Sequence, residues 1–136
     1  MRIKANGTKL YYKESKANAG AKAIIFIHGF PFSHKMWDEQ LEILPVDIIG
    51  IAYDIRGFGY SEIGEIPYSI DLFADDLLAL IDALKLDKPV ICGLSMGGYI
   101  ALRAIEKDQS KIGGLILCDT RSEGDNDEAK IKRFQT

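Results

Sequence analysis

Short apolar runs alternate along this chain with longer segments in which apolar residues recur every three or four positions. Residues 23–27, 48–53 and 114–118 are such runs, and a further one begins at Val90. Each is bounded by polar or glycine residues, which is typical of strands covered on both faces. The alternation of strand and helix from residue 23 to 119 predicts an α/β fold, with a mainly parallel sheet and helices on both faces.

The first fourteen residues have a different pattern. Ile3 and Ala5 alternate with charged residues, Asn6-Gly7 supplies a turn, and residues 10–12 lie on the return strand. This pattern predicts an N-terminal antiparallel hairpin that serves as scaffold.

Two helical segments carry the remaining periodicity. Trp37, Leu41 and Leu44 share one face of a helix closed by Pro45, and size favours a core role for Trp37 over substrate contact. Ser69 can cap a second helix that runs to about Leu86. Its carboxylates are expected to form a solvated face: Asp71, Asp75, Asp76 and Asp82.

The apolar pattern stops at Arg121. We therefore divide the chain into a core, residues 1–120, and a tail or start of a cap, residues 121–136. Asp125 or Asn126 can cap a short helix in this tail, with acidic residues early and basic residues late, as the helix dipole favours.

Composition narrows the class of protein. The 136 residues are 47% hydrophobic and 27% charged, with a net charge of −3, which fits one globular domain and argues against a nucleic-acid partner. No apolar run approaches the roughly 20 residues that span a bilayer, and the N-terminus lacks a signal peptide, so we expect a cytoplasmic protein without a membrane partner. Cys92 and Cys118 are then expected to be reduced core residues. His28 and His34 lack metal-ligand spacing, so neither a metal nor a cofactor is expected.

The strongest chemical signal is Ser95, which interrupts the apolar segment 90–102 within Gly93-Leu94-Ser95-Met96-Gly97. A strand that enters a helix through one tight turn lifts the turn residue above the sheet, beside the unpaired N–H groups of the helix. The pattern therefore predicts a nucleophile next to donors that can stabilise an oxyanion.

Two further loops come directly after buried strands, where α/β proteins place ligand-binding groups. In His28-Gly29-Phe30-Pro31, the Phe30 N–H is either aimed at a substrate oxygen or part of an ordinary turn. In the glycine-punctuated segment 54–61, Asp54 and Arg56 are either catalytic or, as we favour, hold the loop through hydrogen bonds and an ion pair.

The order of these loops, with Trp37 between them and the Ser95 motif after them, resembles the α/β-hydrolase superfamily, and within it the cap-bearing esterase and lactonase branch. The resemblance covers nearly the whole chain. It implies that Ser95 is the nucleophile and that the N–H groups of Phe30 and Met96 form the oxyanion hole. An elbow serine also disfavours dehalogenases and epoxide hydrolases, which place aspartate there.

The chain departs from this family after residue 120. Complete members continue with cap helices, further strands, an acidic triad residue and a catalytic histidine, so this sequence resembles a truncated hydrolase, its N-terminal half. A serine hydroxyl needs a base to take its proton. His34 reaches Ser95 only if its loop folds over the elbow, His28 is used structurally in the family, and Asp119 has no histidine to orient.

Three accounts remain open. The chain is a fragment of a serine hydrolase for an ester, thioester or lactone, with weak or no activity alone. Alternatively it is a non-catalytic module that forms a homodimer or higher oligomer through the unpaired edge at residues 114–118. Finally, a complementary C-terminal polypeptide completes the triad.

Overall fold

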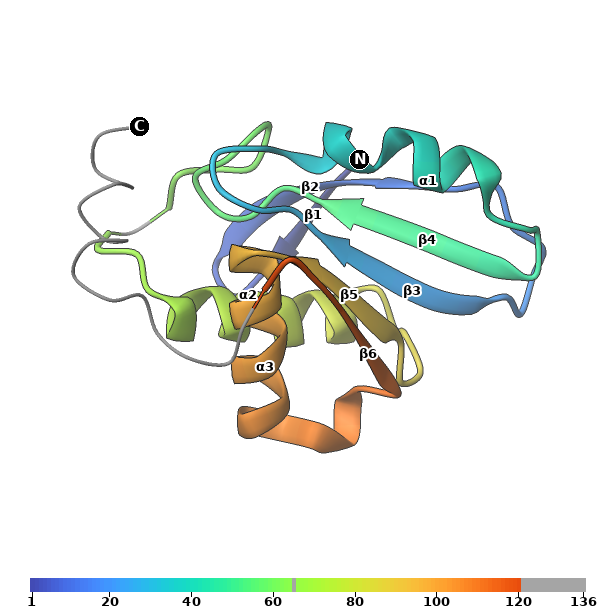
Figure 1. Ribbon diagram of the computed structural model, residues 1–136. Coiled ribbons are helices and arrows are strands. Elements are labelled where there is room, and N and C mark those ends of the chain that lie inside the picture. Colours follow the sequence, from blue (N-terminus) through green and yellow to red (C-terminus); the bar gives the residue numbers. More distant parts are fainter. Residues whose placement is uncertain (65, 121–136) are drawn as a thin grey trace.

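The computed structural model describes residues 1–64 and 66–120, which form a six-stranded sheet in the order β1-β2-β4-β3-β5-β6 (Figure 1). The strands are β1 (Arg2–Ala5), β2 (Thr8–Glu14), β3 (Lys22–Ile27), β4 (Ile48–Tyr53), β5 (Val90–Leu94) and β6 (Gly114–Cys118). Strand β3 pairs in parallel with both β4 and β5, and β5 pairs in parallel with β6. The mainly parallel sheet is therefore confirmed.

The N-terminal hairpin is also confirmed. Strands β1 and β2 are antiparallel, and β2 joins the sheet antiparallel to β4. The turn residues Asn6 and Gly7 both have positive φ, 50° and 74°, as a tight two-residue hairpin turn requires.

Helices cover both faces of the sheet (Figure 1). On one face lie the 3₁₀ turn η1 (His34–Trp37) and helix α1 (Asp38–Ile43), and on the other lie α2 (Ile70–Ala83) and α3 (Met96–Asp108), followed by the 3₁₀ turn η2 (Gln109–Lys111). Ser69 caps α2 as predicted, because its side chain accepts a hydrogen bond from the Leu72 N–H at 3.0 Å.

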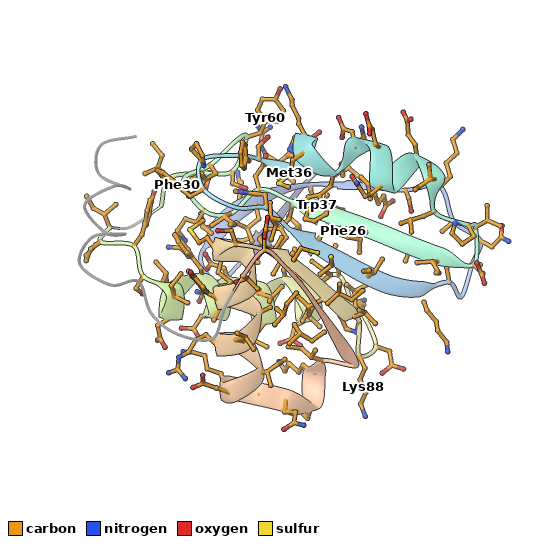
Figure 2. The ribbon with its side chains drawn as sticks, in the orientation of Figure 1. Phe26, Phe30, Met36, Trp37, Tyr60 and Lys88 are labelled. Carbon is orange, nitrogen blue, oxygen red and sulfur yellow. The ribbon has the colours of Figure 1, made fainter. Side chains whose placement is uncertain are left out.

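Successive side chains along the strands point to opposite faces of the sheet and pack into two separate hydrophobic cores. Ile25, Ile51 and Ile91 face α2 and α3, while Phe26, Ala52 and Cys92 face η1 and α1. Trp37 is buried against Phe26, with ring centroids 4.9 Å apart, so its predicted core role is confirmed (Figure 2). Both cysteines are free.

Strand β6 departs from the prediction of a buried strand. It lies at the end of the sheet order, and Ile116 and Leu117 are 45% and 43% exposed. The apolar run predicted a strand correctly, but an edge strand leaves one side uncovered among the described residues, so the same run is only partly buried.

A second correction concerns Asp76, which we expected on a solvated face. It is 2% exposed and forms an ion pair with Arg56, whereas Asp71, on the same helix, is exposed. The carboxylates of this helix therefore do not share one environment, because Asp76 is buried and Asp71 faces solvent.

Two predictions lie outside the described residues: the short helix after Asp125 or Asn126, and the assignment of residues 121–136 as a tail. Within the described ranges, no helix is both long and apolar enough to cross a membrane. The same residues contain no cluster of three side chains suited to hold a metal ion.

Candidate active site

Ser95 connects β5 to α3 in a strained backbone conformation, with φ 50° and ψ −112°. Such a conformation costs about 1–3 kcal/mol in a residue with a side chain, and it persists only where surrounding contacts hold it. The strand-to-helix turn predicted from the sequence is present, with Ser95 half-buried at the N-terminus of α3.

The start of α3 packs directly against the end of β3. A Cβ at Gly97 would collide with the Ile27 carbonyl oxygen, so only glycine allows this approach. On the same side, a Cβ built on Gly29 would lie 3.4 Å from the Ser95 Cβ. The structure therefore brings the loop of His28 to Pro31 against the elbow, although these residues are far apart in sequence.

Two backbone donors in these segments carry no internal hydrogen bond. Among the described residues, neither the Phe30 N–H nor the Met96 N–H donates to a protein acceptor. Met96 is the first residue of α3, and Phe30 lies at the carboxyl end of the parallel strands, where Figure 2 shows its ring. Unpaired donors beside a serine are what an oxyanion hole requires.

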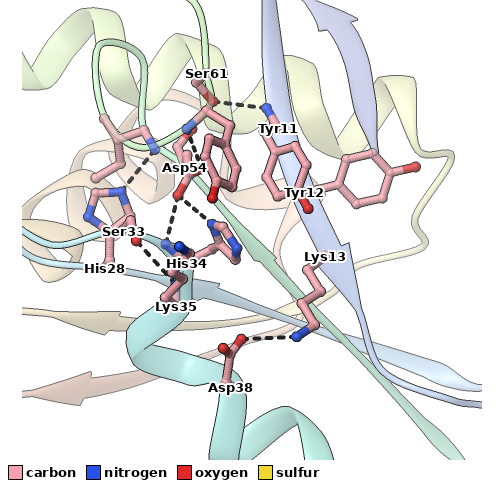
Figure 3. Close-up of polar contacts among 12 residues, drawn as sticks. Tyr11, Tyr12, Lys13, His28, Ser33, His34, Lys35, Asp38, Asp54 and Ser61 are labelled. Atoms are coloured by element: carbon pink, nitrogen blue, oxygen red, sulfur yellow. Dashed lines mark hydrogen bonds and ion pairs between the residues drawn. The ribbon is translucent and has the colours of Figure 1, made fainter.

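His28 is fully buried and uses both ring nitrogens. Its Nδ1–H donates to the Gly29 carbonyl at 2.9 Å. Its Nε2 accepts from the Ile55 N–H at 3.0 Å (Figure 3). Burial lowers the pKa of His28, which keeps the ring neutral. With its acceptor nitrogen occupied, this imidazole cannot take a proton from Ser95, and it joins the Phe30 loop to the loop after β4.

His34 is held by Asp54, and no hydrogen bond among the described residues joins it to Ser95. Its Nδ1–H donates to Asp54 Oδ1 at 2.9 Å, and its backbone N–H donates to the same oxygen at 2.7 Å (Figure 3). The ring also packs beside Tyr11 and Tyr60. Asp54, itself fully buried, accepts a third bond from the Tyr60 N–H at 2.8 Å.

Arg56 has a different partner from the one that the sequence indicated. We expected Asp54 and Arg56 to hold their loop as a pair, but Arg56 instead donates to both carboxylate oxygens of Asp76, at 2.9 and 2.7 Å. It also donates to the carbonyl of Asn6 in the hairpin turn at 3.1 Å. Both residues have the structural role that we favoured, Asp54 through hydrogen bonds and Arg56 through its ion pair with Asp76.

The far side of the elbow is formed by the residues at the end of β6. The Ser95 N–H donates to the Cys118 carbonyl at 3.0 Å, and the Thr120 hydroxyl donates to the Ser95 carbonyl at 2.7 Å. Asp119, between these two residues, is exposed, with φ 45°. The sequence pattern did not single out Thr120. The signal for it is Gly98, directly after the Ser95 motif, where a Cβ would overlap the Thr120 side chain.

The sequence of the chain is similar to those of known proteins. The family model described as alpha/beta hydrolase fold matches residues 22–135. The chain is 40% identical over 100 residues to the AB hydrolase superfamily protein YisY of Bacillus subtilis, a match that covers 71% of this chain and 37% of that protein. The chain therefore belongs to the α/β-hydrolase family.

Two solved structures share its fold closely. A thermophilic esterase from Thermogutta terrifontis superposes with a TM-score of 0.88 at 35% identity, over 99% of this chain and 51% of that one. An enol-lactonase from Burkholderia xenovorans LB400 gives a TM-score of 0.88 at 30% identity, over 97% and 51%. The chain thus spans about half the length of both structures.

Proposed function

We propose that this chain carries the nucleophile and the oxyanion hole of a serine hydrolase that acts on a carboxylic ester, thioester or lactone. The observation that carries the proposal is the strained Ser95 at the start of α3, packed against the loop that holds the unpaired Phe30 N–H. Membership of the α/β-hydrolase family and similarity to an esterase and an enol-lactonase support this substrate class.

In the proposed reaction, Ser95 Oγ attacks the acyl carbon while its proton passes to a base. The carbonyl oxygen gains negative charge and accepts hydrogen bonds from the N–H groups of Phe30 and Met96. The C–O bond, or C–S bond, to the leaving group then breaks, and the leaving group takes the proton. Water attacks the acyl-serine in the same way, which releases the acid and restores the Ser95 hydroxyl.

The base in this scheme does not come from the two histidines of the chain. His28 has its acceptor nitrogen occupied, and no hydrogen bond among the described residues joins His34, held by Asp54, to Ser95. We therefore propose that the acid and base are supplied by further polypeptide, either more of the same protein or a complementary C-terminal chain. Asp119 is exposed beside the elbow, and its carboxylate has no catalytic role until a histidine is present.

The test is hydrolysis of p-nitrophenyl acetate by this chain and by its Ser95→Ala variant. An oxyanion hole without a complete triad retains on the order of a thousandfold acceleration over water, so slow turnover is expected from the chain alone. Loss of that turnover in Ser95→Ala supports the proposal. Equal rates for the two proteins would show that Ser95 is not the nucleophile.

Self-association through β6 is a second proposal, and it is favoured by the exposure of Ile116 and Leu117 on the edge strand. An unpaired apolar edge can pair with the same edge of another copy. We expect a homodimer or higher oligomer at micromolar concentration by light scattering, and a monomer would contradict this proposal.

A further inference from the structure

We propose that Thr120 is a positioning residue for the oxyanion hole, acting through the peptide bond between Ser95 and Met96. This inference rests on the proposed function of Ser95 and adds a residue from the far edge of the sheet. Its basis is the hydrogen bond in which the Thr120 hydroxyl donates to the Ser95 carbonyl oxygen at 2.7 Å.

The bonded carbonyl belongs to the same planar peptide unit as the Met96 N–H. Because the peptide is planar and trans, fixing the direction of its C=O also fixes the direction of its N–H, which points the opposite way. The Met96 N–H is one of the two unpaired donors of the candidate oxyanion hole. Thr120 therefore orients a catalytic donor without touching the substrate. A hydrogen bond to the carbonyl also polarises the peptide and strengthens its N–H as a donor.

The bond acts together with a second contact from the same strand end. The Ser95 N–H donates to the Cys118 carbonyl at 3.0 Å, so the peptide on each side of Ser95 is tied to the end of β6. Within α3, the Ser95 carbonyl also accepts from the Gly98 N–H at 2.9 Å. Together these bonds hold the φ and ψ of a residue whose conformation is strained.

Close packing accounts for the choice of threonine and for Gly98, the glycine that follows the motif. The Thr120 side chain occupies the space that a Cβ at Gly98 would fill. A β-branched side chain has few χ1 rotamers, which keeps the hydroxyl directed at Ser95 once the methyl group is packed. A glycine inside a helix costs stability relative to alanine. At position 98 this cost is explained by the close approach of Thr120, which leaves no room for a Cβ.

The test compares Thr120→Val, which keeps the shape and removes the hydroxyl, with Thr120→Ser, which keeps the hydroxyl. With p-nitrophenyl acetate we expect kcat to fall roughly three- to tenfold in Thr120→Val with little change in KM, because the lost interaction acts in the transition state. Thr120→Ser should recover most of the rate. If Thr120→Val retains the wild-type kcat while Ser95→Ala loses turnover, this inference is wrong and the proposed function stands.

Amide hydrogen exchange gives a readout that does not depend on turnover. In Thr120→Val the amides of Ser95 and Gly98 should exchange faster than in wild type, and in Thr120→Ser they should not. If Ser95→Ala matches wild-type turnover, the proposed function fails and so does the catalytic role of Thr120. Unchanged exchange in Thr120→Val would show that the hydroxyl does not hold the elbow.

A variant on the other side of the contact covers the case in which Thr120→Val does not fold. Gly98→Ala displaces the Thr120 side chain but retains its hydroxyl, and we expect the same fall in kcat and the same faster exchange of the Ser95 amide. In a Thr120→Gly background, which removes every Thr120 atom that the new methyl group would meet, Gly98→Ala should cause no further loss. A further loss in that background would contradict the inference.

Discussion

The two sides of Ser95 are built in opposite ways. On the β4 side, defined here as His28, His34 and the loop at residues 54–61, the polar groups that carry charge or can take protons are buried and paired. On the β6 side, defined as residues 114–120, the strand is partly exposed and contacts the elbow chiefly through a backbone hydrogen bond and Thr120.

The two sides also differ in where they carry histidines and an exposed carboxylate. The β4 side contains both histidines of the chain, yet each is committed to holding a loop. The β6 side contains no histidine but leaves Asp119 exposed beside the nucleophile. Under the function proposed above, the base is therefore expected from further polypeptide and not from either of these two sides.

The largest effect on stability is expected at the buried ion pair of the β4 side. Asp76→Ala leaves the Arg56 guanidinium, 5% exposed, without its carboxylate, and removing one partner of a buried pair costs about 3–5 kcal/mol. Chemical denaturation measures the loss. Asp71→Ala, on the exposed face of the same helix, is the matched control and should cost much less. Similar losses in both variants would contradict the burial of Asp76.

Asp54→Asn tests the three hydrogen bonds that join the two loops. An amide retains one oxygen acceptor but turns its NH2 group toward the donors of His34 or toward the Tyr60 N–H, so we expect a loss of about 1–3 kcal/mol in the free energy of unfolding. Asp38→Asn, which removes only an exposed ion pair with Lys13, serves as the control. An unchanged unfolding midpoint in Asp54→Asn would show that the β4 side is less rigid than we describe.

How far the sequence predicted these features depends on the distance over which each contact acts. The strands, the hairpin turn and the Ser95 elbow are set by local patterns, because adjacent residues determine them. The burial of Asp76 is not set by a local pattern, because its partner Arg56 is twenty residues away and other residues of the same helix are also carboxylates. The role of Thr120 was not predicted for the same reason, because its hydrogen bond to Ser95 joins the ends of two different strands.

On the β6 side we expect a change in association rather than in stability. Ile116→Lys places a charge on the exposed edge strand, which opposes edge-to-edge pairing, and should shift the protein toward monomer in light scattering. Ile43→Lys, at a position 81% exposed on α1, makes the same chemical change away from the edge. A shift of equal size in both variants would mean that net charge, and not the edge, controls association.

The smallest expected effect is a pH dependence from His28. Burial lowers the pKa of His28 in the folded protein below the ordinary 6.5, so the unfolded chain binds a proton first as the pH falls. Stability from this group is therefore complete above about pH 6.5 and declines below it, by at most about 1.4 kcal/mol for each unit of pKa difference. Denaturation curves at about pH 7.5 and about pH 5.5 measure this decline.

His28→Gln supplies the reference for that measurement, since it removes the titrating ring while carboxylates titrate as before. The difference between wild type and variant should shrink at the lower pH. An NMR titration of the two imidazoles provides a direct check, and a His28 pKa at or above 6.5 would contradict the neutral, buried ring.

The proposed role of Ser95 as the nucleophile is tested by locating the acyl group after incubation with p-nitrophenyl acetate. We expect an acetyl group on the peptide that contains Ser95, found by mass spectrometric peptide mapping and lost in Ser95→Ala. Acetylation confined to lysines or to Cys118, at the same level in both proteins, would contradict it.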